Sequence, residues 1–301
     1  MLIVCFGQGL GNQMFQYAFY LALKKAYPAC TVLMDVDHII EKDHNGYELD
    51  RVFGIETNEA RYQDVVKLSG IYPKEFPHGK IMNKLMKMAG AFTGPRTSYI
   101  KPDDTCLFYR EVFELNPLYS YLFDGRWTDE RYFADVSEQV QKAFTFKNEL
   151  NDRNRKYLQQ IQSVNSVSLH IRRGDFAQNG FYLLPQSYYM DALEVVKKKN
   201  PDVELFVFTD EPEKVEKEFQ FEDKYTIIEG NGGKDSYVDM QLMAACKHNI
   251  IANSTFSFWG AFLNDNKEKI VVAPSRFNHK HEAGFYCRDW EILDIEKYIE
   301  E

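Results

Sequence analysis

Apolar runs and helical stretches alternate at the start of the chain. Residues 2–6 form a short apolar run that predicts a strand, and the glycine-rich turn Gly7–Asn12 follows it. The segment Gln13–Tyr27 predicts a helix, since its apolar residues recur at helical spacing (Phe15, Ala18, Phe19, Ala22 and Leu23). Residues 31–34 predict a second strand. The chain therefore opens with a predicted βαβ unit.

The alternation is most regular from Ser166 onward. The predicted strands there are Ser166–Ile171, Leu205–Phe208, Thr226–Ile228, Ile250–Ala252 and Ile270–Val272. The predicted helices between them are Ser187–Lys199, Glu213–Glu218, Tyr237–Lys247 and Phe256–Leu263. Continuous apolar strands separated by helices are typical of a parallel sheet covered on both faces. The second half is therefore expected to be an α/β domain.

The region between these two patterns is less regular. Helices are predicted at Asp135–Ala143 and Leu150–Gln162, and the second of them is expected to close the first half. We therefore predict an N-terminal α/β domain over residues 1–160 and a C-terminal α/β domain over 161–301. The segment Lys80–Ala89 has an apolar stripe beside lysines, which favours a helix on the core, with peripheral contact to a membrane as the alternative.

Composition narrows the function classes. The 301 residues carry a formal net charge of −9, which argues against a nucleic-acid-binding protein. No apolar run approaches the roughly 20 residues that span a bilayer, and the N-terminal run lacks the basic flank of a signal peptide. The five cysteines are scattered without a CxxC pair, as reduced thiols are. We expect a cytoplasmic protein, and the alternative is a location at the inner face of the membrane. The sequence does not predict its oligomeric state.

Polar clusters follow three of the strands predicted in the second half. The first is His170 through Asp175, with two adjacent arginines, the second is Thr209–Glu211, and the third is Asn253–Thr255. Carboxyl ends of parallel strands meet at one edge of a sheet, where such folds bind ligands. Paired guanidinium groups and a helix N-terminus at Ser254 both suit phosphate oxygens. The edge is therefore predicted to bind a diphosphate, with Asp210 or His170 bonding a base or ribose.

Each of these features has a structural alternative. Asp210 and Glu211 also suit the start of the next helix, and Ser254 suits a plain N-cap. One of the two arginines is expected to form an ion pair, for which Asp175 is the nearest carboxylate. The joint occurrence at three strand ends favours the ligand site.

The glycine turn at the start offers a different function. Gly7, Gly9 and Gly11 are spaced G-x-G-x-G, whereas the dinucleotide fingerprint is G-x-G-x-x-G. Asp35, at the end of the next strand, suits a ribose partner, so an NAD(P)-dependent oxidoreductase stays open as an alternative. Asp35 and Asp37 also match a metal-binding D-x-D, but no cluster has metal-ligand spacing. No metal is expected.

Five ordered motifs resemble the inverting α-1,2-fucosyltransferases of glycosyltransferase family 11. They are Gly9–Ala18 (GLGNQMFQYA), Tyr47–Phe53 (YELDRVF), Asp124–Phe133 (DGRWTDERYF), His170–Asp175 (HIRRGD) and the block from Asp239 to Trp259. Arg126 and Thr128 depart from the aromatic and amide usual in that family. The stretch 177–180 also lacks the carboxylate that related α-1,6 enzymes use as a base.

The resemblance implies a GT-B-like fold of two facing Rossmann-like α/β domains with parallel sheets. It implies GDP-β-L-fucose as the donor, a glycan acceptor, no cofactor, and transfer to a hydroxyl, expected to be O2 of a β-galactoside. Arg172 would stabilise the leaving diphosphate, and Asp175 is the nearest candidate base, with ion pairing as its alternative. The predicted donor-binding residues are Asn12, His170, Arg172, Arg173, Asp210, Asn253, Ser254, Thr255 and Phe256. The predicted acceptor-binding residues are Trp127 and Tyr132. A transferase for another GDP-sugar and a non-catalytic sugar-binding protein stay open as alternatives.

Overall fold

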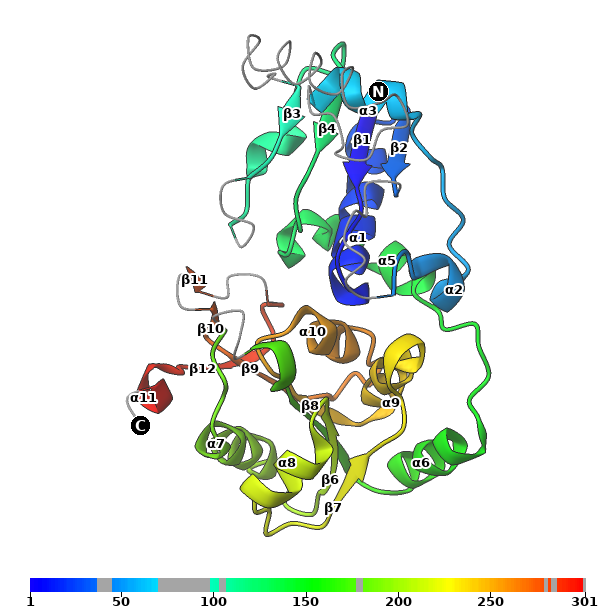
Figure 1. Cartoon of the computed structure of the whole chain (residues 1–301). Helices are drawn as coiled ribbons and strands as arrows, with labels where there is room; N and C mark the ends of the chain where they lie inside the picture. The colour runs from blue at the N-terminus through cyan, green and yellow to red at the C-terminus, as the bar shows by residue number, and fades with distance from the viewer. Residues whose placement is uncertain are drawn as a thin grey trace, which may run out of the picture. The chain divides into compact units, whose positions relative to one another are not determined.

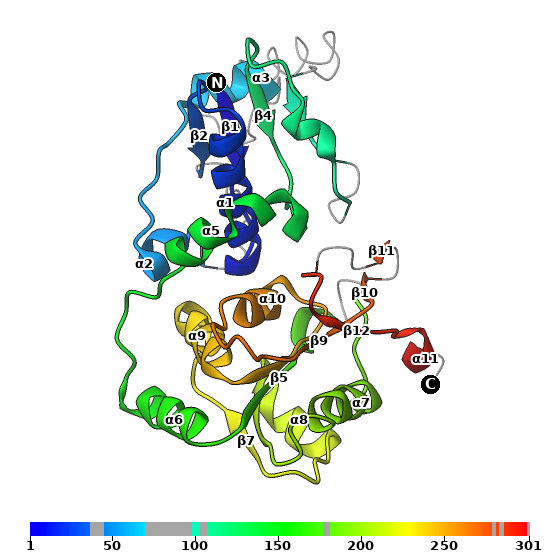
Figure 2. The same cartoon turned by 180° about the vertical axis from the view of Figure 1, so that it is seen from behind.

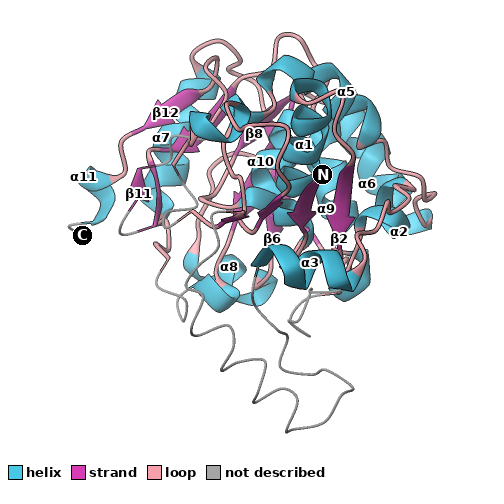
Figure 3. Cartoon of the chain, turned by 90° about the horizontal axis from the view of Figure 1, so that it is seen from above, coloured by secondary structure: helices cyan, strands magenta, loops and turns pink. Residues whose placement is uncertain are grey.

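The computed structural model describes residues 1–36, 45–69, 98–102, 107–176, 181–278, 281–282 and 286–299. The chain divides into two compact units, Met1–Ala143 and Phe144–Glu301. Each is an α/β unit, as Figure 1 shows along the chain and Figure 3 by secondary structure.

The N-terminal unit is built on a four-stranded parallel sheet with the order β2-β1-β4-β3. Its strands are β1 (Leu2–Cys5), β2 (Val32–Asp35), β3 (Tyr99–Ile100) and β4 (Tyr121–Phe123). Its helices are α1 (Leu10–Ala26), α2 (Leu49–Phe53), α3 (Tyr62–Ser69) and α5 (Ser137–Ala143), with 3-10 turns at Arg110–Phe113, Glu130–Tyr132 and Ala134–Val136. Val65 and Leu68 of α3 pack with Ile3 and Leu122 on one face of the sheet. The opening βαβ unit is therefore confirmed.

The C-terminal unit contains a six-stranded parallel sheet with the order β12-β9-β8-β5-β6-β7. Its strands are β5 (Ser166–Ile171), β6 (Glu204–Thr209), β7 (Tyr225–Ile228), β8 (His248–Ile250), β9 (Val271–Pro274) and β12 (Glu291–Leu293). Its helices are α6 (Asp152–Ser163), α7 (Gln186–Lys197), α8 (Pro212–Glu218), α9 (Tyr237–Ala245), α10 (Thr255–Phe262) and α11 (Glu296–Ile299), with 3-10 turns at Gly174–Phe176 and Gly233–Asp235. A short antiparallel pair joins β10 (Arg276–Asn278) to β11 (His281–Glu282).

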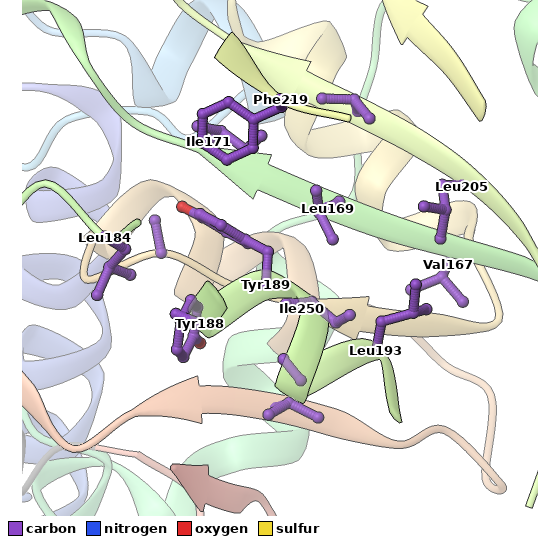
Figure 4. Close-up of a cluster of buried hydrophobic side chains, with 14 of the residues drawn as sticks. Val167, Leu169, Ile171, Leu184, Tyr188, Tyr189, Leu193, Leu205, Phe219 and Ile250 are labelled. Atoms are coloured by element: carbon purple, nitrogen blue, oxygen red, sulfur yellow. The ribbon is translucent and has the colours of Figure 1, made fainter. Parts of the chain in front are cut away.

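Alternating residues of β5 face different layers of helices. Val167, Leu169 and Ile171 are buried in a core with side chains of α7 and α8, which Figure 4 shows from close by. Ser168 faces the opposite layer, where its Oγ accepts a hydrogen bond of 2.7 Å from Asn249 Nδ2. Successive side chains of a strand point to opposite faces, so His170 belongs to this second layer, which α9 and α10 form (Figure 2). A fully buried strand covered on both faces is confirmed.

The boundary between the units differs from the one predicted. The units divide between Ala143 and Phe144, which places α6 in the C-terminal unit, not at the end of the first. Asn154 of α6 and Asn231 exchange two side-chain hydrogen bonds, of 2.8 and 3.1 Å, and both residues are buried. Buried amides need partners, so this pair fixes α6 near the start of α9. Periodicity alone does not show which sheet a helix covers.

No helix in the described part of the chain is long and apolar enough to cross a membrane. The segment Lys80–Ala89, with its two alternative interpretations, lies outside the described residues.

Candidate functional site

The candidate site lies where the C-terminal sheet changes its winding direction. From β5 the chain adds β6 and β7 on one side and then returns to add β8, β9 and β12 on the other. Open parallel sheets bind ligands outside the carboxyl ends of the strands at such a switch point. The segments that leave β5 and β8 here are residues 172–176 and 251–254. Residues 210 and 211 follow β6 at the same edge, so the three predicted clusters meet there.

Arg172 directly follows β5 and is held from two sides. Its Nη1 lies 3.0 Å from Oδ2 of Asp210, which follows the neighbouring strand β6. Its guanidinium carbon lies 5.4 Å from the centre of the Phe176 ring. The side chain keeps 30% of its surface exposed. Arg172 is thus an oriented cation that a ligand can reach.

Arg173 is turned toward its own unit. Its Nη2 lies 3.2 Å from Glu218 Oε2, and its guanidinium carbon lies 5.0 Å from the centre of the Phe219 ring. Only 13% of its side chain is exposed. Its backbone N–H donates to Oδ1 of Asp210 at 2.9 Å. The expected structural arginine is therefore Arg173, and Glu218 is its partner. No sequence pattern indicated that pairing, because Glu218 lies far along the chain, at the end of α8.

The Asp210 carboxylate bonds both arginines: Oδ2 pairs with the guanidinium of Arg172, and Oδ1 accepts from the backbone N–H of Arg173. Of the two residues predicted to start the next helix, Glu211 is the N-cap of α8, which begins at Pro212, whereas Asp210 lies before the cap. Its carboxylate is instead engaged by the turn after β5. Asp210 therefore orients Arg172, and a bond to a base or ribose stays a prediction for Asp210 and His170.

His170 is buried, with 5% of its surface exposed. Burial first, and the positive charge of Arg172 second, lower the pKa of its imidazole to about 3. The ring is therefore neutral near pH 7. Its Nδ1 has no hydrogen-bond partner among the described residues, and its centre lies 5.9 Å from that of Phe256. An orphaned polar atom in a buried ring beside an aromatic suits a planar ligand with hydrogen-bonding edges.

The predicted cluster after β8 divides into structural and accessible residues. Asn253 is buried, and its Nδ2 donates to the carbonyls of Tyr182 (3.2 Å) and Phe277 (2.9 Å). Ser254 caps α10, since its Oγ accepts from the Phe256 N–H at 3.3 Å. Thr255 and Phe256 are partly exposed in the first turn of that helix. The side chains of Asn253 and Ser254 thus stabilise the turn between β8 and α10. Thr255 and Phe256 are the residues of this cluster that a ligand can reach.

Asn12 lies in the N-terminal unit, in the first turn of α1. Its Nδ2 donates to Gln8 Oε1 at 2.9 Å, and its Oδ1 is buried with no partner among the described residues. Gln8 adopts a φ of 65°, in the left-handed region. The neighbouring glutamine of the motif, Gln13, donates to the carbonyls of Gln8 (2.7 Å) and Gly46 (2.8 Å). Much of the first motif therefore serves to fix the turn after β1.

The oxidoreductase interpretation of this turn is not favoured. Gly11 lies within α1, not in the loop that would hold a pyrophosphate. Asp35 is 2% exposed, and its Oδ2 lies 3.6 Å from the Cys5 thiol. A ribose partner has to be more accessible than this carboxylate is.

Trp127 and Tyr132 are not available to stack on an acceptor sugar. They are 1% and 3% exposed, and both pack on Phe19, whose ring centre lies 4.3 Å from that of Trp127. The Tyr132 hydroxyl accepts from the Tyr109 N–H (2.8 Å) and donates to the Leu107 carbonyl (3.1 Å). Both are core residues of the N-terminal unit, and the prediction of acceptor binding is not supported.

Several predicted features lie outside the described part of the structure. They are the side chain of Asp175, the residue Asp37, and the stretch 177–180. Among the described residues, no group of three His, Cys, Asp or Glu side chains lies close enough together to hold a metal ion. Metal-independent action stays a prediction.

Comparison with known proteins identifies the family. The model of glycosyltransferase family 11 matches residues 108–294. An alpha-1,2-colitosyltransferase of Escherichia coli is 31% identical over 92% of either chain. The O-antigen biosynthesis glycosyltransferase WbnK of Escherichia coli is 28% identical over 91% of this chain and 93% of its own. A galactoside alpha-(1,2)-fucosyltransferase 1 of Saimiri sciureus is 25% identical over 47% of this chain and 41% of its own.

Among solved structures, a complex of POFUT1 with GDP covers 97% of both chains at 12% identity, with a TM-score of 0.49. The two α/β units with parallel sheets confirm the predicted α/β, GT-B-like class. Together with the family match and the colitosyltransferase relative, they identify this chain as a glycosyltransferase that belongs to family 11.

Proposed function

We propose that the protein transfers L-fucose from GDP-β-L-fucose to O2 of a β-galactoside, with inversion, and so forms an α-1,2 linkage. The observation that carries the proposal is Arg172, an oriented and partly exposed guanidinium at the switch point of the C-terminal sheet. The names of the relatives support the linkage, since one is an alpha-1,2-colitosyltransferase and another a galactoside alpha-(1,2)-fucosyltransferase. A cytoplasmic site of action stays a prediction.

Leaving-group stabilisation is the main chemical role in this proposal. The acceptor oxygen forms a bond to the anomeric carbon while the bond from that carbon to the β-phosphate oxygen breaks, and GDP leaves with the electron pair. The negative charge that grows on the diphosphate is neutralised by Arg172. Such preorganised charges typically contribute about 10²–10³ in rate. The hydroxyl proton passes to a base that the described residues do not identify, or to the departing diphosphate.

The nucleotide is assigned to the edge of the sheet between the end of β5 and the start of α10. The neutral His170 ring and the Phe256 ring would bind the base or ribose, and the start of α10 at Thr255 would present backbone N–H groups. Asn12, whose Oδ1 has no partner among the described residues, stays a predicted donor-binding residue. Asp210 would act by positioning Arg172. Arg173, the next residue along the chain, would act only indirectly, through its backbone bond to Asp210.

The donor and the linkage are tested by GDP release. GDP-β-L-fucose, GDP-colitose and GDP-mannose are each incubated with β-galactosides and EDTA, and the product linkage is determined. We expect acceptor-dependent release of GDP from GDP-fucose and an α-1,2 product. Release from GDP-colitose or GDP-mannose alone would reject the fucose donor. Stabilisation by NAD(P) without stabilisation by GDP, in thermal-shift titrations, would reject the nucleotide-sugar function itself.

Gly174→Ala is expected to lower kcat between about 10- and 100-fold, the size of effect that misplaced catalytic groups produce. A Cβ on Gly174 would overlap Oδ2 of Asp210 and displace the carboxylate that orients Arg172. The measurement is GDP release at saturating donor. Gly232→Ala is the matched control, because a Cβ there meets no atom within 4 Å. An unchanged kcat in Gly174→Ala would show that the orientation of Arg172 does not depend on Asp210.

A further inference from the structure

The carboxyl edge of the N-terminal sheet carries a second polar cluster. Cys5 and Asp35 end β1 and β2, while Lys101 and Asp124 directly follow β3 and β4. All four strands are parallel, so these residues share one edge. The chain builds β2 on one side of β1 and places β4 on the other, so the switch point lies between β1 and β4.

Asp124 is the most accessible carboxylate of this cluster. Its Oδ2 accepts a hydrogen bond from the Tyr99 hydroxyl and lies 2.9 Å from Nζ of Lys101. Its Oδ1 accepts no hydrogen bond from the described residues, and 36% of the side chain is exposed. One oxygen is therefore fixed by the protein, while the other is open to a ligand.

The neighbours keep their protons and so act as donors. Burial, and then the hydrogen bond to Asp124, raise the pKa of Tyr99 well above its ordinary value. Burial, and then the charge of Asp35, raise the pKa of the Cys5 thiol. The formal charges are two carboxylates, Asp35 and Asp124, against one ammonium, Lys101. Within this cluster the two carboxylates outnumber the single ammonium group, which disfavours an anionic ligand beside Asp124 and suits neutral hydroxyl groups.

The loops at the switch point are held rigidly. Gln16 of α1 accepts from the Gly7 N–H at 3.0 Å and donates to the Gly125 carbonyl at 3.1 Å, which joins the loops after β1 and β4. A Cβ on Gly125 would lie 3.0 Å from Cε2 of Trp127, so the indole packs closely on that glycine. The indole Nε1 of Trp127 is buried with no partner among the described residues. The backbone of Trp127 has a φ of 55°, in the left-handed region. Backbone strain of this kind concentrates at ligand sites.

We propose that Asp124, positioned by Tyr99 and Lys101, binds hydroxyl groups of a neutral acceptor sugar at this edge. The inference rests on the proposed function, because it assigns the acceptor of that reaction. The two donors on Oδ2 fix the position of the carboxylate. Asp124 therefore acts as a hydrogen-bond acceptor that orients the sugar, and it is not assigned the role of the base.

The test uses lactose and its monodeoxy galactose derivatives as acceptors, with the variants Asp124→Asn and Tyr99→Phe. A hydrogen bond to a charged group contributes a net free energy that corresponds to a change in affinity of about 10- to 100-fold. We expect Asp124→Asn to raise the KM for lactose by about that factor, and Tyr99→Phe to raise it less. GDP binding and acceptor-independent hydrolysis of GDP-fucose should stay unchanged. One monodeoxy acceptor should show the same KM with wild type and with Asp124→Asn, since it lacks the hydroxyl concerned.

Asp64→Asn is the matched control, because Asp64 on α3 is another ion-paired aspartate of the N-terminal unit, and its partner Arg61 directly precedes that helix. Thermal unfolding of each variant reports its folding, and Tyr99→Phe keeps the test valid if Asp124→Asn is unstable. A lactose KM that stays at the wild-type value in both folded variants would overturn the inference, and so would an equal penalty on every deoxy acceptor. A wild-type protein that binds no GDP would instead contradict the proposed function, so the two failures are distinct.

Discussion

Arg172→Ala is expected to lower kcat for transfer by about 10²–10³-fold while the protein stays folded. The guanidinium is held by Asp210 and Phe176 in the unbound protein, so it meets the charge of the departing diphosphate without reorganising. In the Arg172→Ala variant, only water stabilises the charge of the departing diphosphate. The measurement is GDP release at saturating donor and acceptor, beside thermal unfolding of the same preparations.

Arg173→Ala is the matched control for this experiment, because the two arginines are adjacent and carry the same charge. The Arg173 side chain contacts Glu218 and Phe219 instead of facing the site. Its loss should lower the midpoint of thermal unfolding and change kcat much less than the loss of Arg172. Equal kcat losses in the two variants, with unchanged stability in both, would contradict the distinction between them.

Trp127→Ala is expected to lower the free energy of unfolding by about 3–5 kcal/mol, the usual cost of emptying a buried aromatic site. The indole is 1% exposed, stacks on Phe19 and meets the rings of Phe123 and Tyr132 edge-on. Urea unfolding followed by fluorescence or circular dichroism measures the change.

Trp127→Phe separates a core role from a sugar-stacking role. It keeps most of the apolar volume and removes an N–H that has no partner among the described residues, so its cost in stability should be small. A Trp127→Ala protein as stable as wild type, with a raised KM for the acceptor, would restore the sugar-stacking interpretation and contradict the core assignment.

The regular elements of the C-terminal sheet were predictable because burial on both faces leaves a clear signal. Strand β5 has the predicted limits, Ser166–Ile171, and all six of its residues are buried. Strands β3 and β4 have only two and three residues, so no pattern of apolar positions announces them. For the same reason the sequence did not point to Lys101, and it marked Asp124 only as the first residue of a motif; the significance of both comes from the strands they follow.

The candidate site was predictable in its location and less so in the roles within it. Topology placed the segments after β5, β6 and β8 at one edge, as expected. The sequence did not distinguish Arg172 from Arg173, because which way each side chain turns depends on Asp210 and Glu218, both distant along the chain. Aromatic residues such as Trp127 likewise have the same sequence pattern in a core as in a sugar site, and only burial separates the two cases.

The most direct test of the central claim is a crystal structure of the protein with GDP bound. We predict that diphosphate oxygens lie within hydrogen-bond distance of the Arg172 guanidinium, at the carboxyl end of β5, with Arg173 still paired to Glu218. A diphosphate bound away from that edge, or one held by Arg173 alone, would contradict the assignment of Arg172 as the residue that receives the leaving group.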